Sequence, residues 1–260
     1  MNGDPVLTGL FGVVGALLGS FLNVCILRWG AEPRQSVVRP PSHCPGCKQP
    51  IAWYDNIPVL SWLVLGGECR RCGTRISIQY PLVELATAAI WAISAGFAPT
   101  VLTALSTAVF QTILLGIAMT DARQYIIPDE FSLGGLALGV AFSLPGGFPA
   151  ILDALIGAVV GFGLLWMVGW AGTRLLKEEA MGGGDMKMMA MVGAFLGWQG
   201  VLLTVFLGAL LGTLIFLPLS VVGKRKLVPF GVFLALGAGA TLWIGPAMVT
   251  WYKTYMGIGA

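Results

Sequence analysis

The sequence has very few charged residues. Only 27 of its 260 residues are Lys, Arg, Asp or Glu, whereas a soluble domain of this length would carry about 65. This scarcity excludes a soluble enzyme with an ordinary solvated surface. The chain is also 57% hydrophobic, which excludes a disordered protein, and its net charge of +3 gives no reason to expect nucleic acid as a partner. What remains is a polytopic membrane protein with about seven or eight spans of about 20 residues each.

Charges, prolines and glycines divide the apolar residues into eight stretches. These are 6–28, 81–98, 100–120, 131–148, 151–173, 186–198, 200–222 and 229–251. Lipid offers no partner to backbone polar groups, so each span must be helical unless the protein is a closed barrel. We therefore predict an all-α polytopic membrane protein with about eight transmembrane helices. The predicted domains are a first transmembrane helix (1–28), a cytoplasmic insert (29–80) and a seven-helix membrane core (81–260).

The basic residues are distributed unevenly between the loops. Eight spans place 28–80, 121–130, 174–187 and 223–228 on one side of the membrane, and fourteen of the fifteen basic residues lie there. Only Lys253 lies on the other side. The positive-inside rule makes the basic side cytoplasmic, and an even number of spans then leaves both termini periplasmic.

The predicted insert contains two CxxC pairs separated by 21 residues, namely Cys44, Cys47, Cys69 and Cys72. Paired CxxC motifs with such a gap are typical of zinc ribbons, and a cytoplasmic location disfavours disulfides. Four thiolates leave no coordination position for water, so the predicted zinc is structural. Reduced thiols in a small folded insert are the alternative. His43 is interpreted as a surface residue rather than a ligand.

Two aspartates are predicted at cytoplasmic ends of spans. Asp121 follows the third apolar stretch, and Asp185 follows Met181-Gly-Gly-Gly184 before the sixth. Carboxylates in membrane helices are costly and usually functional. A close pair shares one proton, so that one carboxylate activates water while the other donates to a substrate carbonyl. This is the chemistry of aspartic proteases. A helix cap, or for Asp121 a pairing with Arg123, is the alternative.

Two further acids have other interpretations. Asp129, in Pro128-Asp129-Glu130, is interpreted as a cap of the fourth span. Glu84 lies four residues after Tyr80 in the second span. It is a candidate for methyl-transfer chemistry, or alternatively for an interfacial ion pair with an arginine of the insert.

Taken in order, motifs along most of the chain resemble the bacterial type IV prepilin peptidases, which are GxGD-type membrane aspartic peptidases. The matching residues are Gly19-Ser20-Phe21-Leu22-Asn23-Val24 with Arg28, the two CxxC pairs with Asn56-Ile-Pro58 and Ser61-Trp62-Leu63, Tyr80-Pro81-Leu82-Val83-Glu84, Asp121 with Ile127-Pro128-Asp129, Gly182-Gly183-Gly184-Asp185-x-Lys187, and Pro229-Phe230-Gly231. Val232 departs from the family pattern, which leads us to expect proline there.

The resemblance implies an inner-membrane endopeptidase with Asp121 and Asp185 as its catalytic pair. Its substrates would be prepilins and pilin-like type II secretion precursors, cut after a glycine between a short basic leader and an apolar helix. Because the tetracysteine insert is complete, the resemblance also implies N-methylation of the new N-terminus with S-adenosylmethionine. No glycine-rich loop of the Rossmann type follows a strand, so we assign methyl transfer to Glu84 and the insert.

Three other functions are compatible with parts of the sequence. The chain could cleave precursors without methylating them. A proton-coupled transporter also uses membrane carboxylates, although it usually places them near the midplane. A scaffold that docks a partner through its zinc ribbon would leave both aspartates unexplained.

Overall fold

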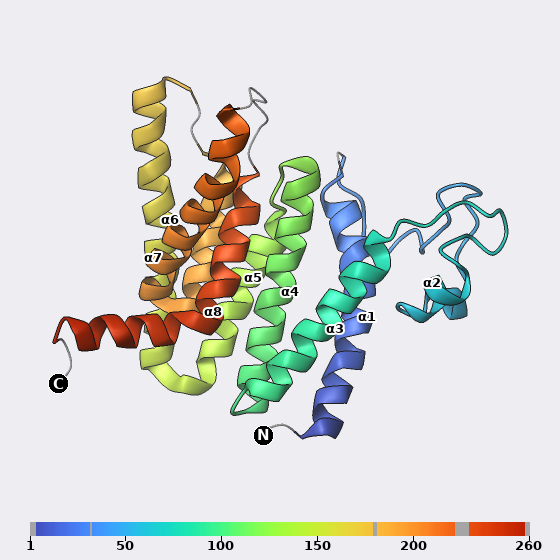
Figure 1. The fold of residues 1–260 in the computed structure, drawn as a ribbon, viewed down its shortest axis with the longest axis horizontal. Coiled ribbons are helices and arrows are strands. Elements are labelled where there is room, and N and C mark those ends of the chain that lie inside the picture. The colour runs from blue at the N-terminus through green and yellow to red at the C-terminus, as the bar shows by residue number, and fades with distance from the viewer. Residues whose placement is uncertain (1–3, 32, 179–180, 222–228, 258–260) are drawn as a thin grey trace. The chain divides into compact units, whose positions relative to one another are not determined.

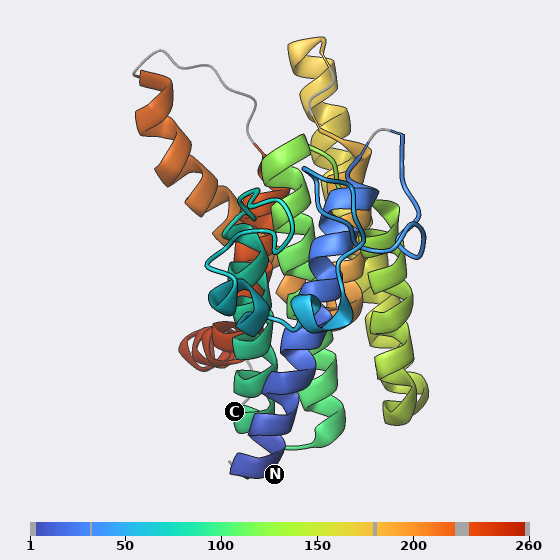
Figure 2. The same cartoon turned by 90° about the vertical axis from the view of Figure 1, so that its right-hand side faces the viewer.

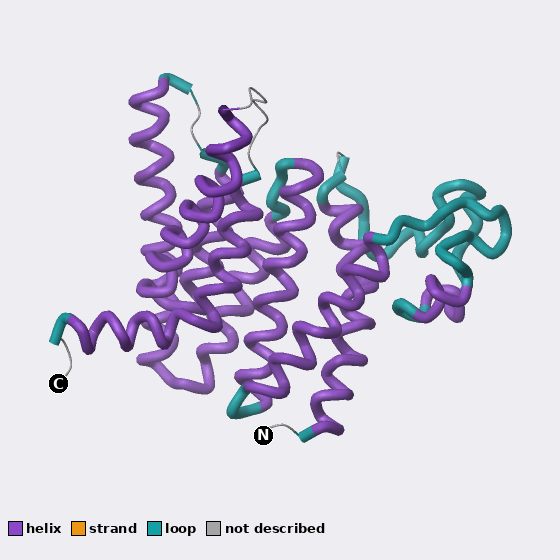
Figure 3. Tube along the Cα trace, viewed as in Figure 1, coloured by secondary structure: helices purple, strands orange, loops and turns teal. Residues whose placement is uncertain are grey.

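The computed structural model describes residues 4–31, 33–178, 181–221 and 229–257 (Figure 1). Its long helices are α1 (Pro5–Trp29), α3 (Gln79–Phe97), α4 (Val101–Gln124), α5 (Asp129–Ser143), α6 (Gly147–Leu176), α7 (Gly183–Val221) and α8 (Phe230–Tyr255). Three short elements are η1 (Trp53–Asn56), α2 (Leu60–Val64) and η2 (Leu144–Gly146). The described residues contain helices and loops but no strand (Figure 3). The all-α prediction is therefore confirmed.

Six helical stretches in the described residues are long and apolar enough to cross a membrane. Two of them contain an internal break. Asp129–Leu176 is interrupted by η2, after which Gly147 has a φ of 73°, and Gly183–Ile215 is interrupted at Gly197, with a φ of 67°. Left-handed backbone of this kind favours glycine. The segments on either side of the breaks correspond to the eight apolar stretches of the sequence.

The first half of α7, residues 183–196, runs antiparallel to α6. Gly193 faces Gly157, and the backbone of Met189 faces Gly161, so closely that neither glycine of α6 has room for a Cβ. Small residues that allow helix backbones to approach are common in membrane helix pairs. This half-helix is about 21 Å long, shorter than the roughly 30 Å hydrocarbon core. It therefore does not cross a bilayer alone.

The second half of α7 runs antiparallel to α8. The Thr204 hydroxyl donates to the Thr241 hydroxyl over 3.2 Å, and Gly208 faces the backbone of Phe233. The first turns of α7 and α8 both contact Ile127. The chain therefore reverses its direction at Gly197, and the two halves of α7 form a hairpin.

By contacts, the chain forms two compact units, Met1–Thr112 and Ile113–Ala260. In the first unit, α1 and α3 pack closely because Gly15 and Gly19 of α1 lie directly against the α3 backbone. The side-chain amide of Asn23 donates to the Tyr80 carbonyl over 3.1 Å, which satisfies a buried polar group. The apolar core of this unit consists of Phe11, Trp91, Ala95, Ala98, Ala104 and Ala108.

The contact between Gly161 and Met189 predicts a difference between two glycines of α6. Gly161→Ala should lower stability by about 1–3 kcal/mol, because its Cβ would meet the Met189 carbonyl, and backbone atoms cannot rotate away. Gly163→Ala is the matched control, since no atom lies within 4 Å of its added Cβ. Thermal unfolding in detergent measures both variants. Equal melting temperatures for the two would contradict the close contact.

Candidate functional site

Asp121 lies in the last turn of α4 and is buried, with 6% of its surface exposed. Its Oδ2 accepts a hydrogen bond from the backbone N–H of Val232 over 3.1 Å. Val232 belongs to the first turn of α8, where backbone N–H groups have no acceptor within the helix. The start of α8 thus holds one oxygen of the Asp121 carboxylate in a fixed position.

Asp185 is the third residue of α7. Its Oδ1 is buried and has no hydrogen-bond partner among the described residues. Gly184, directly before Asp185, and Gly231, which lies against the Asp121 carboxylate, both contact Ile127. The two acids that the sequence singles out are therefore brought to the same region of the second unit. A buried carboxylate oxygen without a donor is costly, and a shared proton or a bound water would satisfy it.

Ile127 brings the three helix ends of this carboxylate site together. A Cβ at Gly184 would lie 3.0 Å from the Ile127 Cβ, and one at Gly231 would lie 2.8 Å from the Ile127 Cδ1 and 2.9 Å from the Asp121 Oδ2. Glycine at both positions therefore allows α7 and α8 to reach the carboxylates. The role of Gly231 and the Val232 N–H was not predicted from the sequence, although Pro229-Phe230-Gly231 is part of the family pattern.

The prediction that Asp129 caps the fourth span is wrong. Pro128 is the N-cap of α5, and no side chain caps this helix. Asp129 is instead the first residue of α5, and its Oδ1 accepts from the Lys187 Nζ over 2.8 Å. The salt bridge joins the start of α5 to Lys187 near the start of α7, two residues after Asp185.

In the first unit, the four cysteines of the insert form one cluster. The Sγ atoms of Cys44, Cys47, Cys69 and Cys72 all lie within 4.8 Å of one another, and the Sγ atoms of Cys44 and Cys72 are 3.7 Å apart. Two zinc-bound thiolates with Zn–S bonds of about 2.3 Å would lie about 3.8 Å apart in a tetrahedron. His43 is exposed and outside this cluster, as predicted.

The two CxxC turns have the same backbone hydrogen bonds. The N–H of Cys44 donates to the carbonyl of Gln49, and that of Cys69 to the carbonyl of Thr74. Four residues after the first cysteine of each pair, Lys48 and Gly73 donate back to that cysteine, and both have positive φ, 58° and 67°. One of these two left-handed positions is a glycine and the other a lysine.

Gly46 lies where the two CxxC turns approach each other closely, and this leaves no space for a side chain. Its added Cβ would clash with the side chain of Thr74 in the second turn. It therefore allows the two CxxC turns to approach each other and bring their sulfurs together.

Electrostatics within the cluster favour a bound cation. Hydrogen bonds from the hydroxyl and backbone of Thr74 lower the pKa of Cys72 to about 6. The backbone N–H of Gln49 favours the Cys47 thiolate, but desolvation and the other three sulfurs outweigh it and raise the pKa of Cys47 to about 11. Four neighbouring thiolates repel one another, and a divalent cation would neutralise this repulsion.

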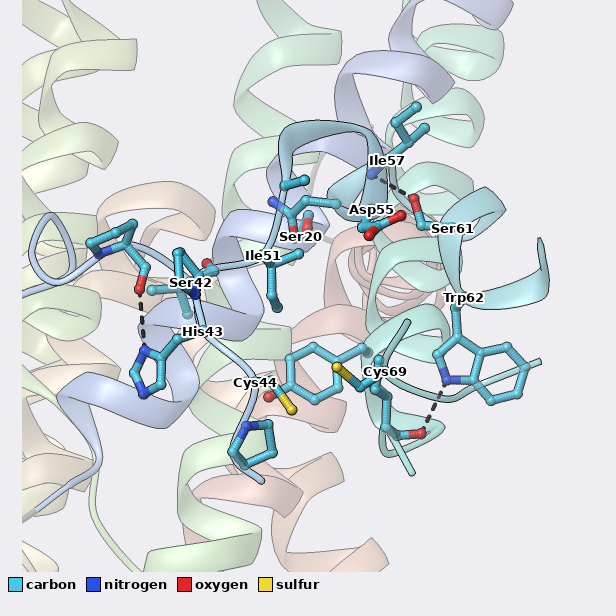
Figure 4. Close-up of a pocket in the computed structure, with 18 of the residues that line it drawn as sticks. Ser20, Ser42, His43, Cys44, Ile51, Asp55, Ile57, Ser61, Trp62 and Cys69 are labelled. Atoms are coloured by element: carbon cyan, nitrogen blue, oxygen red, sulfur yellow. Dashed lines mark hydrogen bonds between the residues drawn. The ribbon is translucent and has the colours of Figure 1, made fainter. Parts of the chain in front are cut away.

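A cavity of about 850 Å³ lies between the insert, α1 and α3 (Figure 4). Its lining includes Ser20 of α1, Glu84 of α3, and Cys44, Asp55 and Trp62 of the insert. Figure 4 shows Asp55 and Ser61 at one end, with Cys44 and Cys69 on another side. Bidentate bonding to Arg70 keeps the pKa of Asp55 below its usual value. The volume is in the range of small-molecule sites.

Glu84 is buried, with 6% of its surface exposed. Its Oε2 accepts from the Val59 N–H over 2.8 Å. Val59 has a φ of 62°, which is strained for a β-branched residue. In the described part of the chain, Glu84 is thus bonded to the backbone of the insert rather than paired with one of its arginines.

These features define a polytopic helical membrane protein with two adjacent aspartates at helix ends and a tetracysteine insert. The sequence matches the models of two known protein families. Residues 13–97 match the bacterial peptidase A24 N-terminal domain, and residues 108–217 match the type IV leader peptidase family. The chain belongs to the type IV leader peptidase family.

Several curated relatives are similar along most of the chain. One from Aeromonas hydrophila is 37% identical over 92% of this chain and 91% of its own length. One from Pseudomonas aeruginosa is 35% identical over 94% of this chain and 93% of its own length. One from Myxococcus xanthus is 40% identical over 85% of this chain and 67% of its own length. Each is named prepilin leader peptidase/N-methyltransferase. No solved structure matches the chain significantly.

Proposed function

We propose that the chain is a membrane aspartic endopeptidase that removes the short basic leader from type IV prepilins and pilin-like secretion proteins. The convergence of Asp121 and Asp185 supports this proposal most directly. The names of the relatives support the substrate class.

In the proposed reaction, the pair holds one proton. The ionised carboxylate takes a proton from a water molecule, whose oxygen attacks the scissile carbonyl, while the protonated carboxyl donates to the carbonyl oxygen. The Val232 N–H donates to Oδ2 of Asp121, and Oδ1 of Asp185, which has no hydrogen-bond partner among the described residues, is the oxygen that can accept from the water. Collapse of the tetrahedral intermediate breaks the C–N bond. The proton taken from the water passes to the leaving amine, and a hydroxyl proton of the intermediate returns to the other carboxylate, so that the pair again holds one proton.

We also propose the orientation predicted from the basic loops. The protein lies in the bacterial inner membrane with both termini periplasmic and the carboxylates at the cytoplasmic face. A basic leader would then remain on the cytoplasmic side, while the apolar helix of the precursor lies among the spans. In this proposal, 1–28 is the first transmembrane helix, 29–80 is the cytoplasmic insert and 81–260 is the membrane core.

The carboxylate pair is tested by single substitutions. Asp121→Asn and Asp185→Asn should each lower cleavage of a purified prepilin in detergent by about 10³-fold or more, because either change removes the shared proton or its acceptor. Asp153→Asn, which alters an exposed acid of α6, is the control and should cleave normally. If either member of the pair can be replaced without losing leader removal, the assignment is wrong.

We further propose that the insert holds one structural zinc ion through Cys44, Cys47, Cys69 and Cys72. The separation of the sulfurs supports this, as does the repeated geometry of the two turns. A small insert without a sizeable apolar core depends on such a metal for its folding.

Metal analysis of the purified chain should find about one zinc per molecule. Cys44→Ser combined with Cys47→Ser should abolish zinc binding, because two of the four thiolates are lost. Cys25→Ser is the matched control, since Cys25 lies in α1 outside the cluster. A full zinc content in the double variant would refute the assignment.

The second proposed activity is N-methylation of the new N-terminus, with the cavity beside Glu84 as its site. S-adenosylmethionine bound there would supply the methyl group. The Glu84 carboxylate is suited to attract the incoming amine and to accept its proton. Its hydrogen bond to Val59 also fixes the wall of the cavity. A peptidase without methylation, or a transporter, would not need this site.

Glu84→Gln separates the two activities. We expect methylation of cleaved pilin to fall by about 10²-fold while leader removal continues, because glutamine keeps the shape and an acceptor oxygen but has no charge. Glu68→Gln, at an exposed acid of the insert, is the control. Mass spectrometry of the product N-terminus distinguishes both steps. Undiminished methylation would rule Glu84 out, and equal loss of both activities would indicate a structural role instead.

A further inference from the structure

The insert exposes an apolar surface that its own fold does not cover. Leu60, Leu63 and Val64 of α2 are 61%, 60% and 80% exposed, and Trp53 and Ile57 are 80% and 40% exposed. We call these five residues the α2 surface. Large apolar groups gathered in so short a segment indicate an interaction site.

The position of α2 along the membrane helices indicates what covers this surface. The residue before α2, Val59, is bonded to Glu84 of α3. The Glu84 Cα in turn lies against Gly19 of α1, where an added Cβ would be only 2.7 Å away. Gly19 lies about 15 Å before the end of α1 at Trp29. In Figure 1, α2 accordingly lies at the level of the first part of α3 and below the upper end of α1.

At the depth of Gly19 along α1, the surroundings of the protein are lipid rather than bulk water. The 25 residues of α1 make a helix of about 37 Å, about 7 Å longer than the hydrocarbon core. Even if all of this excess lies on the side of the insert, Gly19 is about 8 Å inside the hydrocarbon boundary. The Glu84 side chain extends a few Å back toward the start of its helix. The start of α2 therefore lies close to the boundary.

The residues around the α2 surface have the chemistry of a membrane interface. Trp53 contacts Tyr54 edge to face, and the Arg70 guanidinium lies 5.8 Å from the centre of the Tyr54 ring. Trp and Tyr are enriched at the level of lipid headgroups. The insert, 29–80, has six basic and three acidic residues, and such an excess attracts anionic headgroups.

We propose that the α2 surface inserts into the interfacial layer of the bilayer, where Leu60, Leu63 and Val64 contact acyl chains and the basic residues of the insert contact anionic headgroups. The lipid then holds the insert in addition to its hydrogen bonds with Glu84 of α3 and Arg28 of α1. This inference does not depend on either proposed catalytic activity.

Photo-crosslinking of the full chain in lipid nanodiscs tests the proposal. p-Benzoylphenylalanine is placed at Leu63 or Val64, and the discs contain phosphatidylethanolamine and alkyne-tagged phosphatidylglycerol. The matched control is Val38, which is 77% exposed in the same insert. Arg28, at the end of α1, donates to the carbonyls of Ser36 and Pro40 on either side of it, so Val38 should lie outside the lipid.

We expect about tenfold more tagged lipid on residues 63 and 64 than on residue 38, in line with the partition of apolar side chains into lipid. A larger fall in labelling at 64 on addition of untagged phosphatidylglycerol than on addition of the same amount of untagged phosphatidylethanolamine would support the charge contribution, and equal falls would contradict it. Equal lipid labelling at all three positions would overturn the proposal. Crosslinks at 63 and 64 to a second copy, or to added prepilin in place of lipid, would also overturn it.

A second measurement uses the unmodified chain, in case the substituted residues disturb folding. Hydroxyl radicals oxidise solvent-exposed side chains, so Leu60 and Leu63 should be protected in nanodiscs while Val38 is oxidised. Oxidation of Leu60 and Leu63 at the rate of Val38 would contradict insertion into lipid. Neither readout uses cleavage or methylation, so failure of this proposal is distinguishable from failure of the proposed function.

Discussion

The contact of Gly184 and Gly231 with Ile127 is the constraint on which the carboxylate site depends. Each glycine lets a helix begin beside the end of α4: an added Cβ at Gly231 would clash with Ile127 and Asp121, and one at Gly184 would be in tight contact with Ile127. Asp185 follows one glycine and Val232 the other, so the same contact brings the second carboxylate and the backbone donor toward Asp121. Helix starts are the parts of a membrane helix that have free N–H groups, which explains why the site is built from ends rather than from midpoints.

In each unit, one buried carboxylate accepts a hydrogen bond from a backbone N–H. Asp121 is bonded to the N–H of Val232, and Glu84 to the N–H of Val59. In each case the donor is a backbone group from a segment distant in sequence. A backbone donor balances a carboxylate without placing a second charge in the membrane, where charges are costly. Such a bond also holds the donating segment in position, the first turn of α8 in one unit and the start of α2 in the other.

The sequence predicted the helices and the grouping of the four cysteines better than the contacts between the helices. The apolar stretches and their breaks were readable because lipid permits only helices, and the CxxC spacing indicated the sulfur cluster directly. The Val232 and Val59 donors were not predictable, because a backbone N–H has no sequence signature. Asp129 was misassigned because its partner, Lys187, is distant in the sequence. The reversal within α7 was predicted as the boundary between the stretches 186–198 and 200–222, but the sequence did not show that it is made at Gly197.

The proposed chemistry fixes an order for the two activities. The amine to be methylated does not exist until the peptide bond is cleaved, so the carboxylate pair must act before the cavity beside Glu84. The two sites belong to different compact units, and their essential groups have no residue in common. Loss of the later step therefore need not impair the earlier one, whereas loss of Asp121 or Asp185 would remove the substrate for both. Methylation without cleavage is the one combination that this arrangement forbids.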